Sequence, residues 1–209
     1  MKSRISVTAV GLLSCAALAL PIGAHAHHAM DSATPASFIE GLVSGLAHPV
    51  IGLDHLLFIL AMGAACFYFA RSAGTVLTFV LGTLADTAVH LYSATLPYQE
   101  VWVASSLVLL GFLFFRGHGF LRSKAAFALF GVCGIVHGYA YGEAIIGAEP
   151  TPLLAYLGGF ALVQLAIAFA GFAIARYAQR RNLAVGATAF GAALSFAGVV
   201  FLALSVPSM

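Results

Sequence analysis

Six long apolar stretches with very few charged residues make up most of the chain after residue 49. They cover residues 50–70, 75–95, 101–115, 125–146, 152–175 and 183–206. Most approach the roughly 20 residues that an α-helix needs to cross a bilayer, and the third is shorter. The pattern therefore predicts an all-α, polytopic membrane protein, in which about six transmembrane helices form a bundle.

The charge content supports a lipid-facing surface and excludes several classes of protein. Only 8% of the 209 residues are charged and 62% are hydrophobic, whereas a soluble domain carries roughly 25% charged residues. The nine Lys and Arg residues are too few for a surface that follows a phosphate backbone. We therefore exclude a soluble enzyme, a nucleic-acid-binding protein and a disordered chain, and expect the lipid bilayer as the surroundings.

The N-terminus has the three parts of a secretory signal peptide. Lys2 and Arg4 precede an apolar run over residues 7–20, and small residues follow. The A-x-A rule predicts a signal peptide of residues 1–26 with cleavage after Ala26, and cleavage after Ala24 is the second choice. An uncleaved first helix is the alternative, which the shortness of the apolar run disfavours.

Residues 27–49 are predicted to form a periplasmic segment that leads into the membrane. The segment begins with His27 and His28, which together with the amino terminus could bind Ni²⁺ or Cu²⁺. Its second half, residues 38–47, is too short to cross a bilayer and is expected to form an interfacial helix before Pro49 opens the first span. Residues 50–209 are then the transmembrane domain.

The basic residues that remain after cleavage determine the predicted orientation. They all follow the first, third and fifth apolar stretches: Arg71, Arg116, Arg122, Lys124, Arg176, Arg180 and Arg181. Loops rich in Lys and Arg stay in the cytoplasm, so both mature termini are predicted to be periplasmic in a bacterial inner membrane. The acidic residues then lie on the outer side or at its interface, where they would attract cations: Asp31, Glu40, Glu100 and Glu149.

Ionisable residues recur inside the predicted spans at overlapping depths. Three spans each carry one acid and one histidine: Asp54 and His55, Asp86 and His90, and His137 and Glu143. Such groups are costly in hydrocarbon unless they are paired, bound to a ligand or exposed to water. Asp86 and His90 are four residues apart and share one helical face. Imidazole and carboxylate together suit divalent transition metals, so the pattern predicts a polar cavity that binds a cation.

Two further sets of residues in the spans have structural interpretations. Gly134, Gly138 and Gly142 repeat every four residues beside His137, and such a ladder lets a neighbouring helix approach closely. Cys66 and Cys133 lie in the inner halves of their spans and are expected to pack there without forming a disulfide.

Short motifs of the chain resemble signatures of the HupE/UreJ family of nickel permeases. His48 precedes the Asp54-His55 pair with five residues between His48 and Asp54, which is similar to the family's H-x5-D-H motif. Residues 97–100 are similar to its P-x-x-E entry to a span. The signal peptide followed by six spans also matches, so the resemblance covers essentially the whole chain.

A further motif carries this resemblance with two departures. The sequence from His137 to Glu143 is similar to the family motif H-G-x-A-x-G-x-E. In that motif the Glu follows the His by seven residues, where this chain has Ala144, so Glu143 stands one place early. Val136 stands where the family has an aromatic residue. Because one residue rotates a side chain by about 100° on a helix, Glu143 and the family's Glu would point in different directions.

The resemblance implies uptake of Ni²⁺, or of Co²⁺, across the inner membrane to supply enzymes such as hydrogenase or urease. From the chemistry of the residues themselves, His48 near the entrance would pass the ion inward to Asp54, His55, His90 and His137. The Asp86 and His90 pair is not part of the resemblance and rests on their helical spacing alone. The ion is the substrate, and we expect neither a resident cofactor nor an enzyme activity. No G-x4-G-K-[ST] loop occurs in the sequence, so the chain cannot itself use ATP. The choice of ion, the coupling and homo-oligomer formation stay open.

Two other classes of function are alternatives at this point. A membrane-embedded zinc hydrolase could use the same His and Asp residues around an activated water molecule. A di-haem electron carrier needs two pairs of axial histidines, and only His55, His90 and His137 lie within the predicted spans.

Overall fold

The structure is a computed structural model, which describes residues 34–69, 73–90, 97–116, 118–142, 145–183 and 186–205. Over these residues the chain forms eight helices and no strand. The helices are α2 (Phe38–Ile51), α3 (Leu53–Tyr68), α4 (Gly74–His90), α5 (Gln99–Arg116), α6 (His118–Arg122), α7 (Ala125–Gly142), α8 (Pro150–Arg180) and α9 (Ala187–Ser205). The predicted all-α fold is thus confirmed for the described residues. The predicted signal peptide lies outside them.

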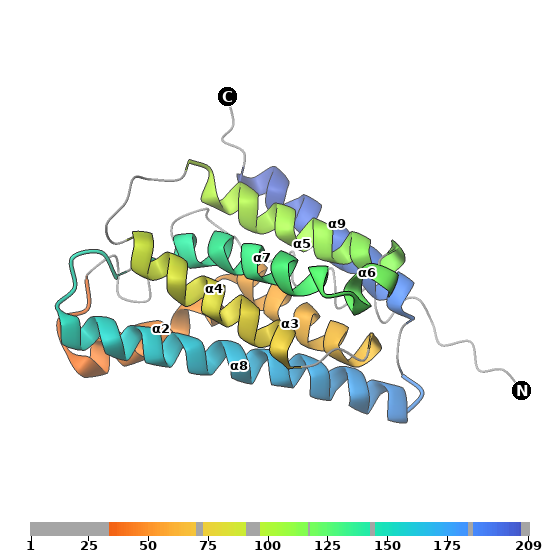
Figure 1. Ribbon diagram of the computed structural model, residues 1–209, viewed down its shortest axis with the longest axis horizontal. Helices are drawn as coiled ribbons and strands as arrows, with labels where there is room; N and C mark the ends of the chain where they lie inside the picture. The colour runs from red at the N-terminus through yellow and green to blue at the C-terminus, as the bar shows by residue number, and fades with distance from the viewer. Residues whose placement is uncertain are drawn as a thin grey trace, which may run out of the picture.

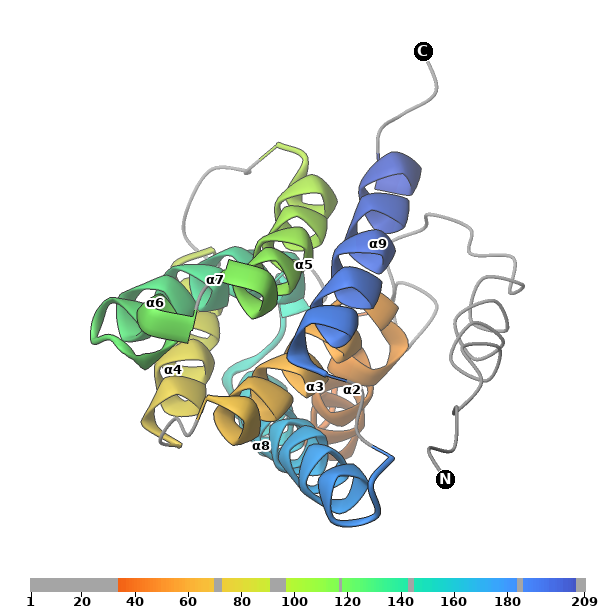
Figure 2. The same cartoon turned by 90° about the vertical axis from the view of Figure 1, so that its right-hand side faces the viewer.

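The helices pack side by side around α3. The closest pairs are α4 with α7, α5 with α9, and α8 with both α2 and α3 (Figure 1). In the view of Figure 2, α3 lies in the interior, where it contacts α2, α4, α5, α8 and α9. Side chains at the start of α3 can therefore meet residues from several helices.

The helices α3, α4, α5, α7, α8 and α9 alternate in direction along the bundle. In Figure 1, α3, α5 and α8 run towards the end at which α6 lies, and α4, α7 and α9 run back. As a result α4 and α7 are parallel to each other, whereas α5 and α9 are antiparallel.

Only some of the six predicted spans are helices that are long and apolar enough to cross a membrane. α7, α8 and α9 are the three described helices that are each long and apolar enough to cross a membrane. α2 and α3 pass that test only together, and they are bent by 79°. The apolar parts of α4 (Gly74–Ala88) and α5 (Gln99–Phe115) are shorter. Among the described residues, the helices that could cross number three, or four if the bent pair forms one span.

The helix before the first predicted span extends further than residues 38–47. Ser37 caps its start, because the Ser37 Oγ accepts a hydrogen bond from the Glu40 N–H at 3.2 Å. It continues through Pro49 in its last turn, where the missing N–H removes the helical hydrogen bond to the Gly45 carbonyl oxygen, and the helix ends two residues later at Ile51. The helix packs along α8, where a Cβ atom on Gly45 would overlap the Tyr156 carbonyl oxygen. The break between α2 and α3 therefore comes after Pro49.

The glycine ladder brings α7 into backbone contact with α4. A Cβ atom on Gly134 would overlap the Phe79 carbonyl oxygen, and one on Gly138 would overlap that of Thr83. The predicted close approach is thus confirmed at these two glycines. It holds His137, the neighbour of Gly138, in the interior between helices.

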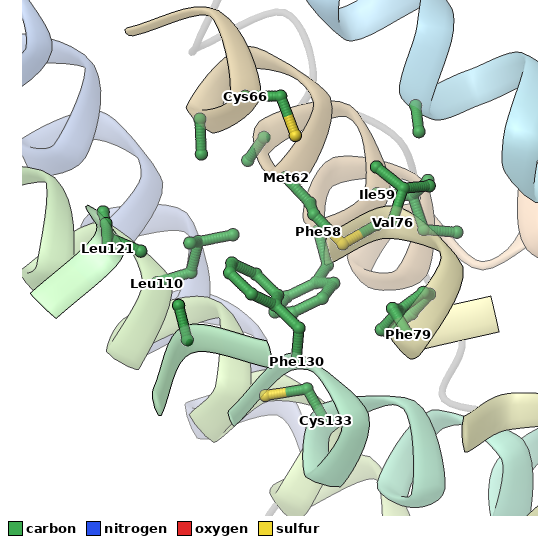
Figure 3. Packing of buried hydrophobic residues seen from close by; sticks show 14 of the residues in the cluster. Phe58, Ile59, Met62, Cys66, Val76, Phe79, Leu110, Leu121, Phe130 and Cys133 are labelled. Carbon is green, nitrogen blue, oxygen red and sulfur yellow. The ribbon is translucent and has the colours of Figure 1, made fainter. Parts of the chain in front are cut away.

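Aromatic and aliphatic side chains fill the centre of the bundle. Figure 3 shows Phe58 of α3 between Phe79 of α4 and Phe130 of α7, at ring-centroid distances of 5.3 and 6.4 Å. Cys66 and Cys133 form no disulfide and are both buried in the same cluster, as predicted. This cluster lies next to the histidines of the candidate site, since the Phe58 ring contacts His137.

Candidate metal path

Three of the predicted histidines gather around the ring of Tyr141. His48 comes from the last turn of α2, His55 from the first turn of α3, and His137 from α7, one turn before Tyr141. The ring centroids of His48, His55 and His137 lie 5.1, 4.4 and 6.4 Å from that of Tyr141. The bend at Gly52 separates two helix ends that each present a histidine to this ring.

His55 and His137 are in direct contact. Their Nδ1 atoms are 2.9 Å apart, and 6% of His55 and 0% of His137 is exposed. One nitrogen of this pair donates a hydrogen and the other accepts it. Adjacent ligands at right angles around an ion, each about 2.1 Å from it, are roughly 3.0 Å apart. The two nitrogens are therefore spaced so that both could bind one ion if the shared hydrogen were lost.

Ser106 of α5 holds the other side of the His137 ring. The Ser106 Oγ is 2.9 Å from the His137 Nε2 and 2.7 Å from the Val103 carbonyl oxygen. Ser106 was not among the residues predicted from the sequence. The available signal was the Ser105-Ser106 pair within an apolar stretch, which is weak because serine commonly bonds to a carbonyl of its own helix.

Tyr156 of α8 connects His48 to α7. Its hydroxyl donates to the Tyr141 carbonyl oxygen at 2.9 Å and lies 3.3 Å from the His48 Nδ1. Because the hydroxyl hydrogen is used on the carbonyl, the tyrosine oxygen accepts from His48. Tyr156 was also missed, since an aromatic residue in an apolar stretch indicates packing more often than a polar role.

Two of the three predicted acids lie among the described residues, and one of them, Asp54, contacts a predicted histidine. Asp54 is adjacent to His55, and its Oδ1 accepts the His55 backbone N–H at 2.8 Å. Asp86 of α4 lies against α7, where its Cβ atom would be 3.0 Å from a Cβ on Gly138. Glu143 and the side chain of His90 lie outside the described residues.

The described residues do not form a preorganised metal-binding site. No group of three or more His, Cys, Asp or Glu side chains in that part of the chain is arranged to hold one ion. The structure brings His55 and His137 into contact and keeps His48 6.5 Å from His55, measured between ring centroids. The arrangement is a row of imidazoles that could bind an ion in succession.

Beyond His137 the interior is apolar. The Phe58 and Phe79 rings lie 4.6 and 5.2 Å from the imidazole, measured between centroids. A narrow crevice without room for a water molecule adjoins them, with Ser106 and Cys133 as its polar or sulfur-containing side chains. The rest of its lining is apolar: Phe58, Leu109, Leu110, Leu113, Leu129 and Phe130. The Phe58 and Phe79 rings therefore block the row of histidines on the side of the apolar core.

Comparisons with known proteins match nearly the whole chain. The family model described as HupE / UreJ protein matches residues 6–201. A curated protein named Protein HupE, from Rhizobium leguminosarum bv. viciae, is 28% identical over 194 residues, which are 90% of this chain and 94% of that protein. No solved structure matches the chain.

Proposed function

The chain belongs to the HupE / UreJ family, and on this premise we propose that it is a permease that imports Ni²⁺, or Co²⁺, into the cytoplasm. The metal then supplies enzymes such as hydrogenase or urease. The ion is the substrate, and the chain acts as a transporter without a catalytic step.

The observation that carries the proposal is the contact between His55 and His137. Two imidazoles from different helices meet inside an apolar bundle, with their Nδ1 atoms 2.9 Å apart. Polar groups in such surroundings are costly, and in membrane proteins they mark the paths of ions and substrates. Imidazole is a ligand that suits Ni²⁺ and Co²⁺.

The ion moves from His48 to the pair formed by His55 and His137. His48 lies near the end of α2, and Tyr156 holds its ring towards the other two histidines. Asp54 and Asp86 provide negative charge beside these steps, and His90 and Glu143 are further ligands of the path. Binding at several weak sites allows the ion to leave, as transport requires.

The aromatic rings next to His137 form the closed inner side of the path. Phe58 and Phe79 cover the imidazole on the side that faces the apolar core. On the proposed path, passage of the ion requires these rings to move apart, which opens the path towards the cytoplasm.

The proposed topology has six spans after a cleaved signal peptide, with both mature termini in the periplasm. Three features support it: six helices alternate in direction, the bent pair of α2 and α3 passes the length test together, and the exposed Arg122 and Arg180 lie where α6 and α8 end. In this topology the histidines lie in the outer half of the bundle, because α3 begins and α7 ends there.

The membrane potential is the proposed driving force for import of the cation. A membrane potential contributes about 2.3 kcal/mol per charge per 100 mV, so a divalent cation gains twice that amount on moving inward. Proton coupling through the acids of the path is the second mechanism compatible with this residue set.

The test is uptake of radioactive nickel into cells that lack their own nickel importers. The intact chain is compared with His55→Ala, His137→Ala and the control His118→Ala, at matched amounts of protein in the membrane. His118 begins α6 and has no place in the proposed path. We expect uptake by the intact chain and the control, and at least a tenfold lower rate in the two path variants.

Cobalt added as a competitor ranks the two ions. Competition at equal concentration supports a path for both, and no competition restricts the substrate to nickel. If the intact chain raises uptake of neither ion above that of cells without it, the proposal is wrong. The zinc hydrolase alternative has no specific observation in its favour, because no three described His, Cys, Asp or Glu side chains are arranged to hold one ion.

A further inference from the structure

Ser106 makes two short contacts that together decide where its hydrogen goes. Its Oγ lies 2.7 Å from the Val103 carbonyl oxygen and 2.9 Å from the His137 Nε2. A hydroxyl has one hydrogen, and a carbonyl oxygen can only accept. The Ser106 hydrogen therefore points to Val103, as is common for a serine that bonds back to its own helix. Towards His137, the Ser106 oxygen is an acceptor.

Because the Ser106 oxygen is an acceptor, it determines which nitrogen of the His137 ring is protonated. The Nε2 must carry a hydrogen in order to donate to Ser106. Adding a second hydrogen would place a charge on a side chain that is 0% exposed and surrounded by Phe58 and Phe79, which is costly. The ring is then neutral, and its Nδ1 carries the lone pair. This lone pair faces the His55 Nδ1, 2.9 Å away, which donates to it.

We propose that Ser106 is a positioning residue, which holds His137 in the Nε2-protonated form and so keeps its Nδ1 lone pair aimed at His55. The proposal rests on the function proposed above, in which these two nitrogens bind the passing ion. A metal ion needs an unprotonated nitrogen, and the partner of the other ring nitrogen selects which one is available. Without Ser106, the hydrogen can move to Nδ1, where it blocks the side that faces the path.

The first test measures the tautomer of the His137 ring directly and does not depend on a transport assay. Purified protein with ¹⁵N-labelled histidine, in lipid and without metal, is compared by NMR with the His137→Gln variant, which identifies the His137 signals. We expect Nε2 to be protonated and Nδ1 to be unprotonated in the intact chain. In Ser106→Ala we expect a mixture of the two neutral forms. An intact chain that is protonated at Nδ1 would overturn the proposal.

The second test measures radioactive nickel uptake by Ser106→Ala, Ser106→Thr and the control Ser105→Ala. Ser105 is the neighbour on the same helix, and its Oγ donates to the Val101 carbonyl oxygen at 2.6 Å. We expect uptake to fall at least tenfold in Ser106→Ala, which is the effect of losing the hydrogen-bond partner of a metal ligand. Threonine keeps a hydroxyl with the same bonding and should restore most of the uptake, and the control should match the intact chain.

The two tests together separate the possible roles of Ser106. If Ser106→Ala loses uptake while the His137 tautomer stays unchanged, the proposal is overturned, because that result indicates a packing role for Ser106. A changed ring form with normal uptake would overturn it as well. If the intact chain transports no metal, the permease function fails while the NMR result still decides whether Ser106 sets the ring form. Should Ser106→Ala not fold, Ser106→Thr and the intact chain supply the NMR comparison, and a Thr variant with the ring form altered contradicts the proposal.

Discussion

Tyr141 and Tyr156 are both completely buried beside the histidines, but their hydroxyl groups are used differently. The Tyr156 hydroxyl bonds to the Tyr141 carbonyl oxygen and to His48. Among the residues that the structure describes, the Tyr141 hydroxyl has no hydrogen-bond partner. Burying a polar group without a partner is costly, whereas a bonded one contributes to stability. At the scale of single residues, this difference leads to two opposite predictions.

Tyr156→Phe should destabilise the protein and weaken the first step of the path. The change removes the donor to the Tyr141 carbonyl and the acceptor for His48. We expect a loss of about 1 kcal/mol in the free energy of unfolding. Thermal melting in detergent measures this loss, and nickel uptake, which should fall severalfold, measures the effect on His48. An unchanged melting temperature would show that these hydrogen bonds are not formed in the protein.

Tyr141→Phe should stabilise the protein. The phenylalanine ring keeps the contacts with the histidines and removes a buried hydroxyl that has no described partner. We expect a gain of about 1 kcal/mol, which raises the melting temperature by about 2 to 4 °C in a chain of this size. The same melting experiment checks it. A lower melting temperature would mean that the hydroxyl is bonded in the protein, for example to an ion in the path.

At the scale of helices, glycines determine how closely the elements of the bundle approach. α7 meets α4 at Gly134 and Gly138, and α2 meets α8 at Gly45, in each case through backbone carbonyl oxygens. The ladder in α7 could be predicted because it repeats along one face of one helix. Gly41 and Gly45 of α2 have the same four-residue spacing, and their Cβ atoms would overlap the carbonyl oxygens of Pro152 and Tyr156 in α8.

Gly134→Ala should disrupt the contact between α4 and α7. Its Cβ atom would overlap the Phe79 carbonyl oxygen, so the two helices must move apart. We expect a loss of about 1 to 3 kcal/mol, the usual effect of overpacking, and a lower yield of monodisperse protein in size-exclusion chromatography. Gly131→Ala on the same helix is the control, because its Cβ atom would be 3.9 Å from the Thr78 carbonyl oxygen, an ordinary contact. Equal yields for the two variants would contradict the close approach.

At the scale of the whole molecule, the alternation of helix directions and the basic residues suggest the same orientation. α3, α5 and α8 end on the side of α6, and the exposed basic residues Arg122, Lys124 and Arg180 lie at ends or turns on that side. Positively charged loops stay in the cytoplasm.

A pair of single cysteines tests the orientation. We expect a membrane-impermeant thiol reagent to label Glu149→Cys in intact spheroplasts and Lys124→Cys only after lysis. Both positions are exposed, the native Cys66 and Cys133 are buried, and Cys15 belongs to the predicted signal peptide, so the unchanged chain is the unlabelled control. Labelling of Lys124→Cys in intact spheroplasts would reverse the proposed topology, and with it the direction of import.

The sequence by itself determined that the chain is helical and apolar and which ionisable residues lie inside its apolar stretches. These are local properties, because composition and periodicity are visible within a single stretch. Only the tertiary structure brings His48, His55 and His137 together around the ring of Tyr141. It also places Ser106 and Tyr156 within hydrogen-bond distance of His137 and His48. Such contacts join residues up to 108 positions apart, and they depend on where helices bend and how closely glycines let them pack. No local pattern contains that information.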